Sequence, residues 1–144
     1  MRHLASWLVR VAPLAATIVV ASACGATQQG AADRLPVVRV SERDFHIAVS
    51  PRRIASRDVR LVMQNHGPDT HELIIVRAGR PGLPLRLDGL TVNEEALKSV
   101  ATVEGTGPGT VEELRLHLKR GRYELFCNMA GHFMAGMHAE LVVQ

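Results

Sequence analysis

Short apolar and β-branched segments recur along the chain between polar turn signals. In several of them apolar and polar side chains alternate, as at Val59, Leu61 and Met63, which is the period of a strand with one buried face. Seven short strands separated by turns predict an all-β protein with the architecture of a β-sandwich. The segments span residues 37–40, 45–49, 59–65, 71–78, 111–118, 122–127 and 138–143.

The interval between residues 78 and 109 interrupts this pattern. It is rich in Gly and Pro, and its one helical candidate is the segment NEEALKSV at residues 93–100. Asn93 is a favourable N-cap residue, and Glu94 and Glu95 follow it in the first turn, where carboxylates complement the helix dipole. We therefore expect a long excursion between two strands that contains one short helix.

Residues 1–23 have the pattern of a secretory signal peptide. Arg2 and Arg10 precede an apolar run that ends in the small residues ASA, after which signal peptidase can cleave. The run is shorter than the roughly 20 residues that span a bilayer, and Pro13 interrupts it. Cys24 follows directly, as in a bacterial lipobox, where the cysteine is lipidated and becomes the mature N-terminus.

The rest of the chain divides into a tether and one domain. Residues 24–35 are small and polar, as expected of a flexible tether between a lipid and a domain. Residues 36–144 contain all the predicted strands and suffice for one domain with a modest core. We expect a monomer that is exported and held by lipid on Cys24 at the outer face of the cell membrane, or one that is periplasmic.

The charge of the chain gives no evidence for a nucleic-acid partner. Without Arg2 and Arg10, 15 of the 17 basic residues remain against 14 acidic ones, a formal net charge of +1. Acidic and basic residues follow one another along the chain, so no basic face is visible in the sequence. We therefore expect no interaction with nucleic acid.

A run near the C-terminus, CNMAGHFMAGM, places Cys127, His132 and Met137 at equal steps between two apolar segments. If the loop between them is tight, the thiol, the imidazole and the thioether would point toward one place. Gly131 and Gly136 permit the backbone angles that such a loop needs, and they let the backbone pass close to a metal. The spacing therefore indicates a metal site.

A fourth donor is available at His71. It follows the turn in QNHGPDTHELIIV, so it lies at the end of a strand rather than in its middle. Two imidazoles, one thiolate and one weak thioether are the donor set of a blue-copper electron-transfer site. Met134 also carries a thioether, but it lies inside the loop, whereas Met137 opens the last strand.

Other interpretations of Cys127 remain open. A lone thiol in an oxidising compartment is a hazard unless it is buried or bound to metal, and an inert buried cysteine is common. Zinc prefers four good donors, or three with water, so a thioether helps neither kind of zinc site. A cysteine nucleophile with a histidine base also fits the residue types, but no sequence feature supplies an oxyanion hole.

The segments NHGPDTHELIIV and LKRGRYELFCNMAGHFMAGMHAELVV resemble the two copper-ligand blocks of the cupredoxins. The spacing C-x4-H-x4-M is similar to that of small exported rusticyanin-like and sulfocyanin-like forms, and the resemblance covers residues 36–144. It implies a Greek-key β-sandwich with the site near one end. It also implies one type 1 copper ion with His71, Cys127 and His132 as equatorial ligands and Met137 as axial ligand.

The chain departs from the cupredoxin pattern at two places. Glu72 stands where many cupredoxins have an Asn that ties the two ligand loops together. The turn before Tyr123, which commonly holds Pro-Gly, is Arg120-Gly121 here, so it keeps the glycine and loses some rigidity.

The function that this resemblance implies is transfer of single electrons by cycling between Cu(I) and Cu(II), without enzyme activity. In cupredoxins the histidine equivalent to His132 reaches the surface through an apolar collar. We therefore expect a redox partner protein to dock near His132, Phe133 and Met134. The alternative is a cell-surface copper-binding or copper-delivery protein, and a structural protein that has lost copper is the third interpretation.

Overall fold

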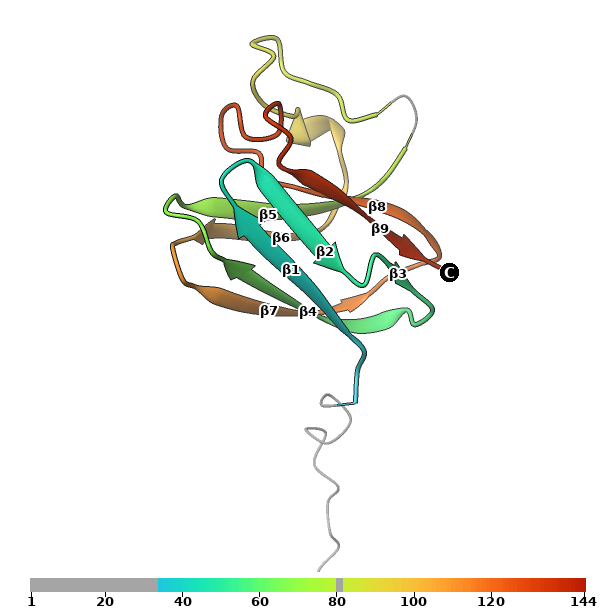
Figure 1. Ribbon diagram of the computed structural model, residues 1–144. Coiled ribbons are helices and arrows are strands. Elements are labelled where there is room, and N and C mark those ends of the chain that lie inside the picture. Colours follow the sequence, from blue (N-terminus) through green and yellow to red (C-terminus); the bar gives the residue numbers. More distant parts are fainter. Residues whose placement is uncertain (1–33, 80–81) are drawn as a thin grey trace, which may run out of the picture.

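Two β-sheets packed face to face form the part of the chain that the computed structural model describes, which is residues 34–79 and 82–144 (Figure 1). The predicted signal peptide and most of the predicted tether lie outside these residues. The first sheet has the order β2-β1-β4-β7, with β1 at Val37–Arg43, β2 at His46–Ser50, β4 at Asp58–Asn65 and β7 at Val111–His117. The second has the order β3-β9-β8-β5-β6, with β3 at Arg53–Ile54, β5 at His71–Arg77, β6 at Ser99–Thr106, β8 at Gly121–Phe126 and β9 at His138–Val143.

The main core lies between the two sheets, and the alternation in the sequence explains why. Successive side chains of a strand point to opposite faces, so every second residue of β1 and β4 enters the core. The two strands pair in parallel with Val38 opposite Leu61 and Val40 opposite Met63, and all four side chains are buried. The predicted β-sandwich is therefore confirmed.

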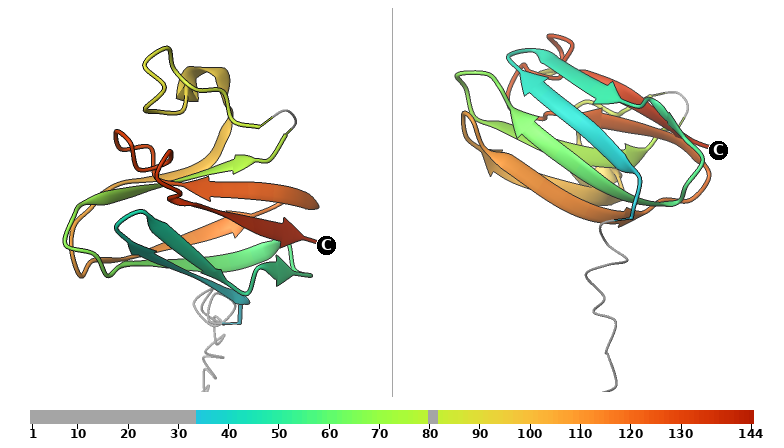
Figure 2. Two further views of the ribbon diagram at one scale, coloured as in Figure 1. Left: turned by 45° about the horizontal axis from the view of Figure 1, so that its top comes forward. Right: turned by 60° about the horizontal axis from the view of Figure 1, so that its bottom comes forward.

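Strand β5 is buried on both faces, in agreement with its uninterrupted apolar run LIIV. Leu73 and Ile75 belong to the core between the sheets. Ile74 and Val76 face the other way and join Val92 and Phe126 in a second, smaller cluster. The loop after β5 covers this outer face, as Figure 2 shows.

The prediction of a helix at residues 93–100 is wrong. Only a 3₁₀ turn at Glu94–Ala96 forms, and the side chain of Asn93 makes no capping hydrogen bond. The chain then enters β6, an edge strand that pairs antiparallel with β5 and that the sequence pattern did not indicate. So short a helix is marginal by itself, and pairing with a buried strand stabilises the extended backbone instead.

The register of the second sheet brings distant segments to one end of the sandwich. Strands β5 and β8 are antiparallel with Ile74 opposite Phe126, so the start of β5 lies beside the end of β8. Strand β9 pairs antiparallel with β8, with His138 opposite Phe126. His71, the first residue of β5, and Cys127 and Met137, which lie just outside β8 and β9, therefore share one end of the molecule. Among the described residues, no helix is long and apolar enough to cross a membrane.

Candidate metal centre

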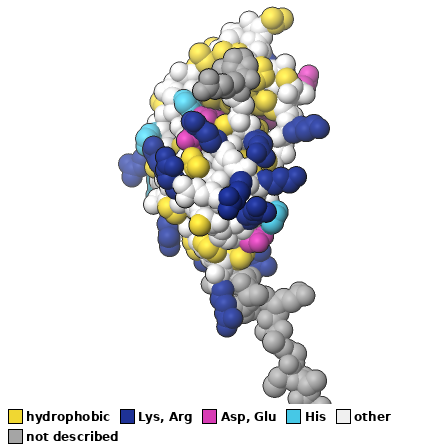
Figure 3. Space-filling model, turned by 90° about the vertical axis from the view of Figure 1, so that its right-hand side faces the viewer, with side chains coloured by type: hydrophobic (Ala, Val, Ile, Leu, Met, Phe, Trp, Pro, Cys, Tyr) yellow, Lys and Arg dark blue, Asp and Glu magenta, His cyan; other side chains and the backbone are white. Residues whose placement is uncertain are grey.

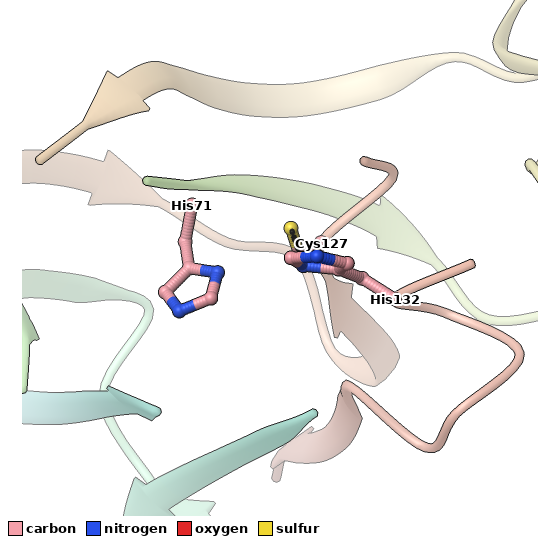
Figure 4. A group of neighbouring side chains, drawn as sticks. All are labelled: His71, Cys127 and His132. Atoms are coloured by element: carbon pink, nitrogen blue, oxygen red, sulfur yellow. Dashed lines mark hydrogen bonds between the residues drawn. The ribbon is translucent and has the colours of Figure 1, made fainter. Parts of the chain in front are cut away.

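Three of the four predicted ligands meet at this end of the sandwich (Figure 4). Donor atoms of His71, Cys127 and His132 all lie within 4.8 Å of one another. The Cys127 sulfur is 3.5 Å from Nδ1 of His132, and the two imidazole rings have centroids 5.3 Å apart. His71 and Cys127 are fully buried, whereas His132 is half-buried.

The imidazole of His71 is buried without a hydrogen-bond partner for either ring nitrogen among the described residues. A carboxylate oxygen of Asp44 lies 3.3 Å from Nε2, but its orientation is not that of a hydrogen bond. Burial lowers the pKa of His71, and the neighbouring His132 lowers it further, while Asp44 acts in the opposite direction. Buried polar atoms are normally satisfied, so a neutral imidazole with two orphaned nitrogens fits a metal ligand.

The turn before His71 is held by Asn65, the last residue of β4. Its side-chain amide donates to the carbonyl oxygens of Asp69 at 2.7 Å and Thr106 at 2.8 Å, and its oxygen accepts the N–H of Gly67 at 2.8 Å. A Cβ at Gly67 would lie 2.6 Å from the Asp44 carboxylate and 3.1 Å from Nε2 of His71. Only glycine lets the turn approach the imidazole so closely.

Without a bound cation, the surroundings of the Cys127 thiol favour its neutral form. Burial raises its pKa, and backbone N–H groups of Glu72 and Met129 that hydrogen-bond to the sulfur offset part of this effect. The carboxyl groups of Glu72 and Glu42 also favour the neutral thiol. Cys127 would hold a cation as the thiolate, which the two N–H groups would stabilise.

A side-chain clamp joins the two ligand segments at the position where the cupredoxin pattern has Asn. Oε1 of Glu72 accepts the backbone N–H of Asn128 at 2.9 Å. The Asn128 amide oxygen accepts the N–H of Val92 at 2.6 Å, and the amide nitrogen donates to the Val92 carbonyl at 3.0 Å and to Glu94 at 2.6 Å. Glu72 thus makes the connection that its departure from Asn put in question, and the loop after β5 is tied to the same centre.

The ligand loop between β8 and β9 is a compact series of turns. Gly131 and Gly136 have φ values of 82° and 103°, in the region that favours glycine. The N–H of Met137 donates to the His132 carbonyl at 3.0 Å, and the Met137 carbonyl accepts the N–H of Cys127 at 3.1 Å. Met137 is fully buried in the main core, whereas Met134 is 53% exposed. The burial of Met137 agrees with its proposed axial role.

Phe45 covers His132 from the turn between β1 and β2, and nothing in the sequence pattern singled it out. The two rings lie edge to face, with centroids 5.3 Å apart. Phe45 has a φ of 61°, which is uncommon for a bulky residue, and its side chain is half exposed. Backbone in this region costs free energy and persists where the surroundings impose it, often at functional sites.

Glu42, on β1, is a second residue that sequence reasoning missed. It is fully buried, and neither carboxylate oxygen has a hydrogen-bond partner among the described residues. Loss of hydration raises its pKa to about 8, with a further contribution from Glu72. The alternation of Val38 and Val40 with polar neighbours points position 42 into the core, and this was the available signal.

The other histidines among the described residues lie outside the centre. His46 and His66 are exposed, His117 pairs with Asp58 at 2.7 Å, and His138 pairs with Glu124 at 2.7 Å. Phe133 is half-buried, with its ring against Phe126 at 5.6 Å between centroids.

Comparison with known proteins finds similarity in structure only. Neither a protein-family model nor a curated protein matches the amino-acid sequence significantly. Reduced auracyanin from Roseiflexus castenholzii matches with a TM-score of 0.56 and 15% identity over 75% of this chain and 96% of its own. Rusticyanin from Thiobacillus ferrooxidans matches with a TM-score of 0.55 and 16% identity over 75% and 77%. Auracyanin A, a blue copper protein from Chloroflexus aurantiacus, matches with a TM-score of 0.53 and 15% identity over 75% and 98%.

These similar structures are cupredoxins, and the described domain therefore has the cupredoxin fold. The fold expected from the two ligand-like blocks is confirmed. The cluster of His71, Cys127 and His132, with Met137 nearby in the core, has the composition of a single type 1 copper site.

Proposed function

We propose that this protein is an exported type 1 copper protein that carries single electrons, with His71, Cys127, His132 and Met137 as its ligands. The observation that carries the proposal is the convergence of two imidazoles and one thiol within 4.8 Å, with the nitrogens of His71 left without partners. Copper, when bound, supplies a couple between Cu(I) and Cu(II). The proposed role is that of a carrier rather than an enzyme.

The residues around the site favour fast electron exchange because they hold the donors in place. The Glu72–Asn128 clamp fixes the two ligand segments relative to each other, and the Asn65 bonds hold the turn before His71 against β6. Donors that move little between oxidation states need little reorganisation when the electron is transferred. Burial of His71 and Cys127 also excludes water from the donors.

A redox partner is proposed to dock around His132, the one half-exposed donor. Phe45, Leu90, Met129 and Met134 are exposed apolar side chains on the turns that adjoin it. The N–H of Gly131 donates to the Leu90 carbonyl at 3.0 Å, which places the loop after β5 beside the ligand loop. A small apolar surface suits a brief encounter with fast release. Phe133, also expected at the docking surface, is half-buried with its ring against Phe126 and His138.

Burial of the donors favours electron transfer over copper delivery. A delivery protein must hand the metal to an acceptor, which requires the acceptor's ligands to reach it. Here His71, Cys127 and Met137 are all fully buried, and Phe45 covers the edge of His132. An electron can pass through the His132 imidazole without any of these side chains moving.

The proposal is tested by adding Cu(II) to the purified protein. We expect an intense thiolate-to-copper charge-transfer band that Cys127→Ser abolishes and that Cys24→Ser, the change at the only other cysteine, preserves. Stoichiometric copper bound without this band would rule out a type 1 site.

A second measurement separates the carrier from the delivery protein. Reduced and oxidised samples are mixed with a redox partner and with an apo copper acceptor, while absorbance and the location of copper are followed. Electron exchange without movement of copper is expected. Net transfer of copper on the timescale of reduction would favour delivery.

A further inference from the structure

Positive charge gathers at the end of the sandwich opposite the metal centre, as Figure 3 shows for the face that carries it. The residues come from the turn around β3, the start of β4, the turn after β7 and the start of β8. All of their side chains are exposed. This basic pole consists of Arg52, Arg53, Arg57, Lys119, Arg120 and Arg122.

Backbone pairing holds these separate segments together. Arg53 of β3 pairs with Val142 of β9, which in turn pairs with Arg122 of β8. The N–H of Leu118 donates to the Arg57 carbonyl at 2.7 Å, so Arg57 adjoins Lys119. The basic pole is therefore a fixed feature of the fold.

Few anionic groups neutralise this surface. Glu140 pairs with Arg122, and the Asp58 carboxylate is engaged with His117 at 2.7 Å. The other five cationic side chains of the pole have no ion pair or side-chain hydrogen bond with any described residue.

The N-terminal segment enters the domain at the same end. Strand β1 begins at Val37, and the Pro36 carbonyl accepts the N–H of Arg60 at 2.9 Å, near the start of β4. Arg34, exposed, adds a further charge there. A flexible chain of the length expected for the tether, residues 24–35, would have an end-to-end distance of about 20 Å. Lipid on Cys24 would thus bring the basic pole, rather than the metal centre, to the membrane surface.

We propose that the basic pole binds the anionic headgroups of phospholipids and orients the domain on the membrane with the metal centre facing away. Acidic side chains on the metal-centre side, among them Asp44, Asp69 and Glu94, disfavour the reverse orientation. Strands of six to eight residues separate the two ends by roughly 20 Å, which leaves His132 and its apolar surroundings open to a redox partner.

The test uses the chain from residue 24 onward with Cys24→Ser, so that no lipid contributes. Binding is measured to vesicles of phosphatidylcholine with phosphatidylglycerol and to vesicles of phosphatidylcholine alone. We expect binding only to the anionic vesicles, with release at high salt. One cation near an anionic surface strengthens binding about fivefold, so the variant R52Q/R53Q/R57Q/K119Q should bind at least about tenfold more weakly.

A matched control removes the same number of charges from elsewhere, in the variant R39Q/R43Q/K98Q/R115Q, and should bind nearly as well as the parent protein. Hydrogen exchange in the presence of vesicles should protect residues 52–57 and 118–122 and leave 129–136 unchanged. Equal weakening by both variants, equal binding to neutral vesicles, or no binding would overturn the proposal. The proposal would also be overturned if R52Q/R53Q/R57Q/K119Q bound anionic vesicles like the parent protein and only reacted more slowly with an acidic redox partner.

This inference rests on the proposed export and tethering, but its test requires neither bound copper nor a lipid anchor on Cys24. A protein without the blue band that still binds anionic vesicles through the basic pole would contradict the proposed function alone. A protein that shows the blue band but does not bind anionic vesicles would contradict this inference alone.

Discussion

Replacing Glu42 by Gln is expected to stabilise the copper-free protein above pH 5, by an amount that grows with pH. The carboxyl group is fully buried without a hydrogen-bond partner among the described residues, and its pKa is raised from 4.5 to about 8. Between these values the folded protein keeps a proton that the unfolded chain has released. The contribution of Glu42 to stability is therefore fully present below pH 4.5 and is lost as the pH rises to about 8.

The size of the effect follows from the two pKa values. One pH unit corresponds to about 1.4 kcal/mol, so the interval from 4.5 to 7 amounts to roughly 3 kcal/mol for wild type. Gln has nearly the same shape and cannot ionise. The two proteins should thus have similar free energies of unfolding near pH 4.5, and the variant should be more stable by roughly 3 kcal/mol at pH 7.

Urea unfolding of the reduced, copper-free proteins, followed by far-UV circular dichroism at several pH values, measures this difference. Circular dichroism is the suitable signal because the single tryptophan, Trp7, belongs to the predicted signal peptide. Ionisation of His71 affects both proteins alike, so it cancels in the difference. Glu112→Gln, at an exposed carboxylate, is the control and should give no such trend. Free energies of Glu42→Gln and wild type that run parallel from pH 5 to 8 would refute the reasoning.

Three further changes test the centre and the tether. Met137→Leu should retain copper and raise the reduction potential, because a donor that stabilises Cu(II) is lost. Met134→Leu should change the potential much less. If voltammetry gives the opposite ranking, Met134 rather than Met137 is the axial ligand. Glu72→Ala should lower the free energy of unfolding by about 1–3 kcal/mol, since it leaves the buried N–H of Asn128 unsatisfied, while Glu72→Gln keeps an acceptor and should lower it less. Wild type should partition with membranes and carry a lipid mass that Cys24→Ser lacks, and an unmodified wild-type Cys24 would disprove the anchor.

The sequence determined those features that depend on local spacing. Alternation in β1 and β4 and the apolar run in β5 encode the buried faces, because side-chain direction follows directly from strand geometry. The C-x4-H-x4-M spacing likewise fixed where Cys127 and His132 lie, since both belong to one short loop. His71 could be assigned to the same site because it lies at a strand end after a recognisable turn.

Tertiary pairing decided the rest. Residues 93–100 favour a helix locally, but β6 forms because an edge of β5 is available to pair with it. The Glu72–Asn128 clamp joins residues on different strands, and the burial of Glu42 depends on the second sheet closing over the first. No pattern along the chain records the Glu72–Asn128 contact, and the alternation in β1 indicates only which face of the strand carries Glu42.

The distribution of charge also separates what the sequence determines from what tertiary pairing determines. Along the sequence basic and acidic residues follow one another, and the net charge is small. In the folded molecule, β3 lies beside β9 and the turn after β7 lies beside the start of β4, so Arg53, Arg57 and Lys119 come to one end. The sequence determines which charges exist, but only the long-range pairing of strand ends determines which of them share a surface, because that pairing sets distances that chain separation does not.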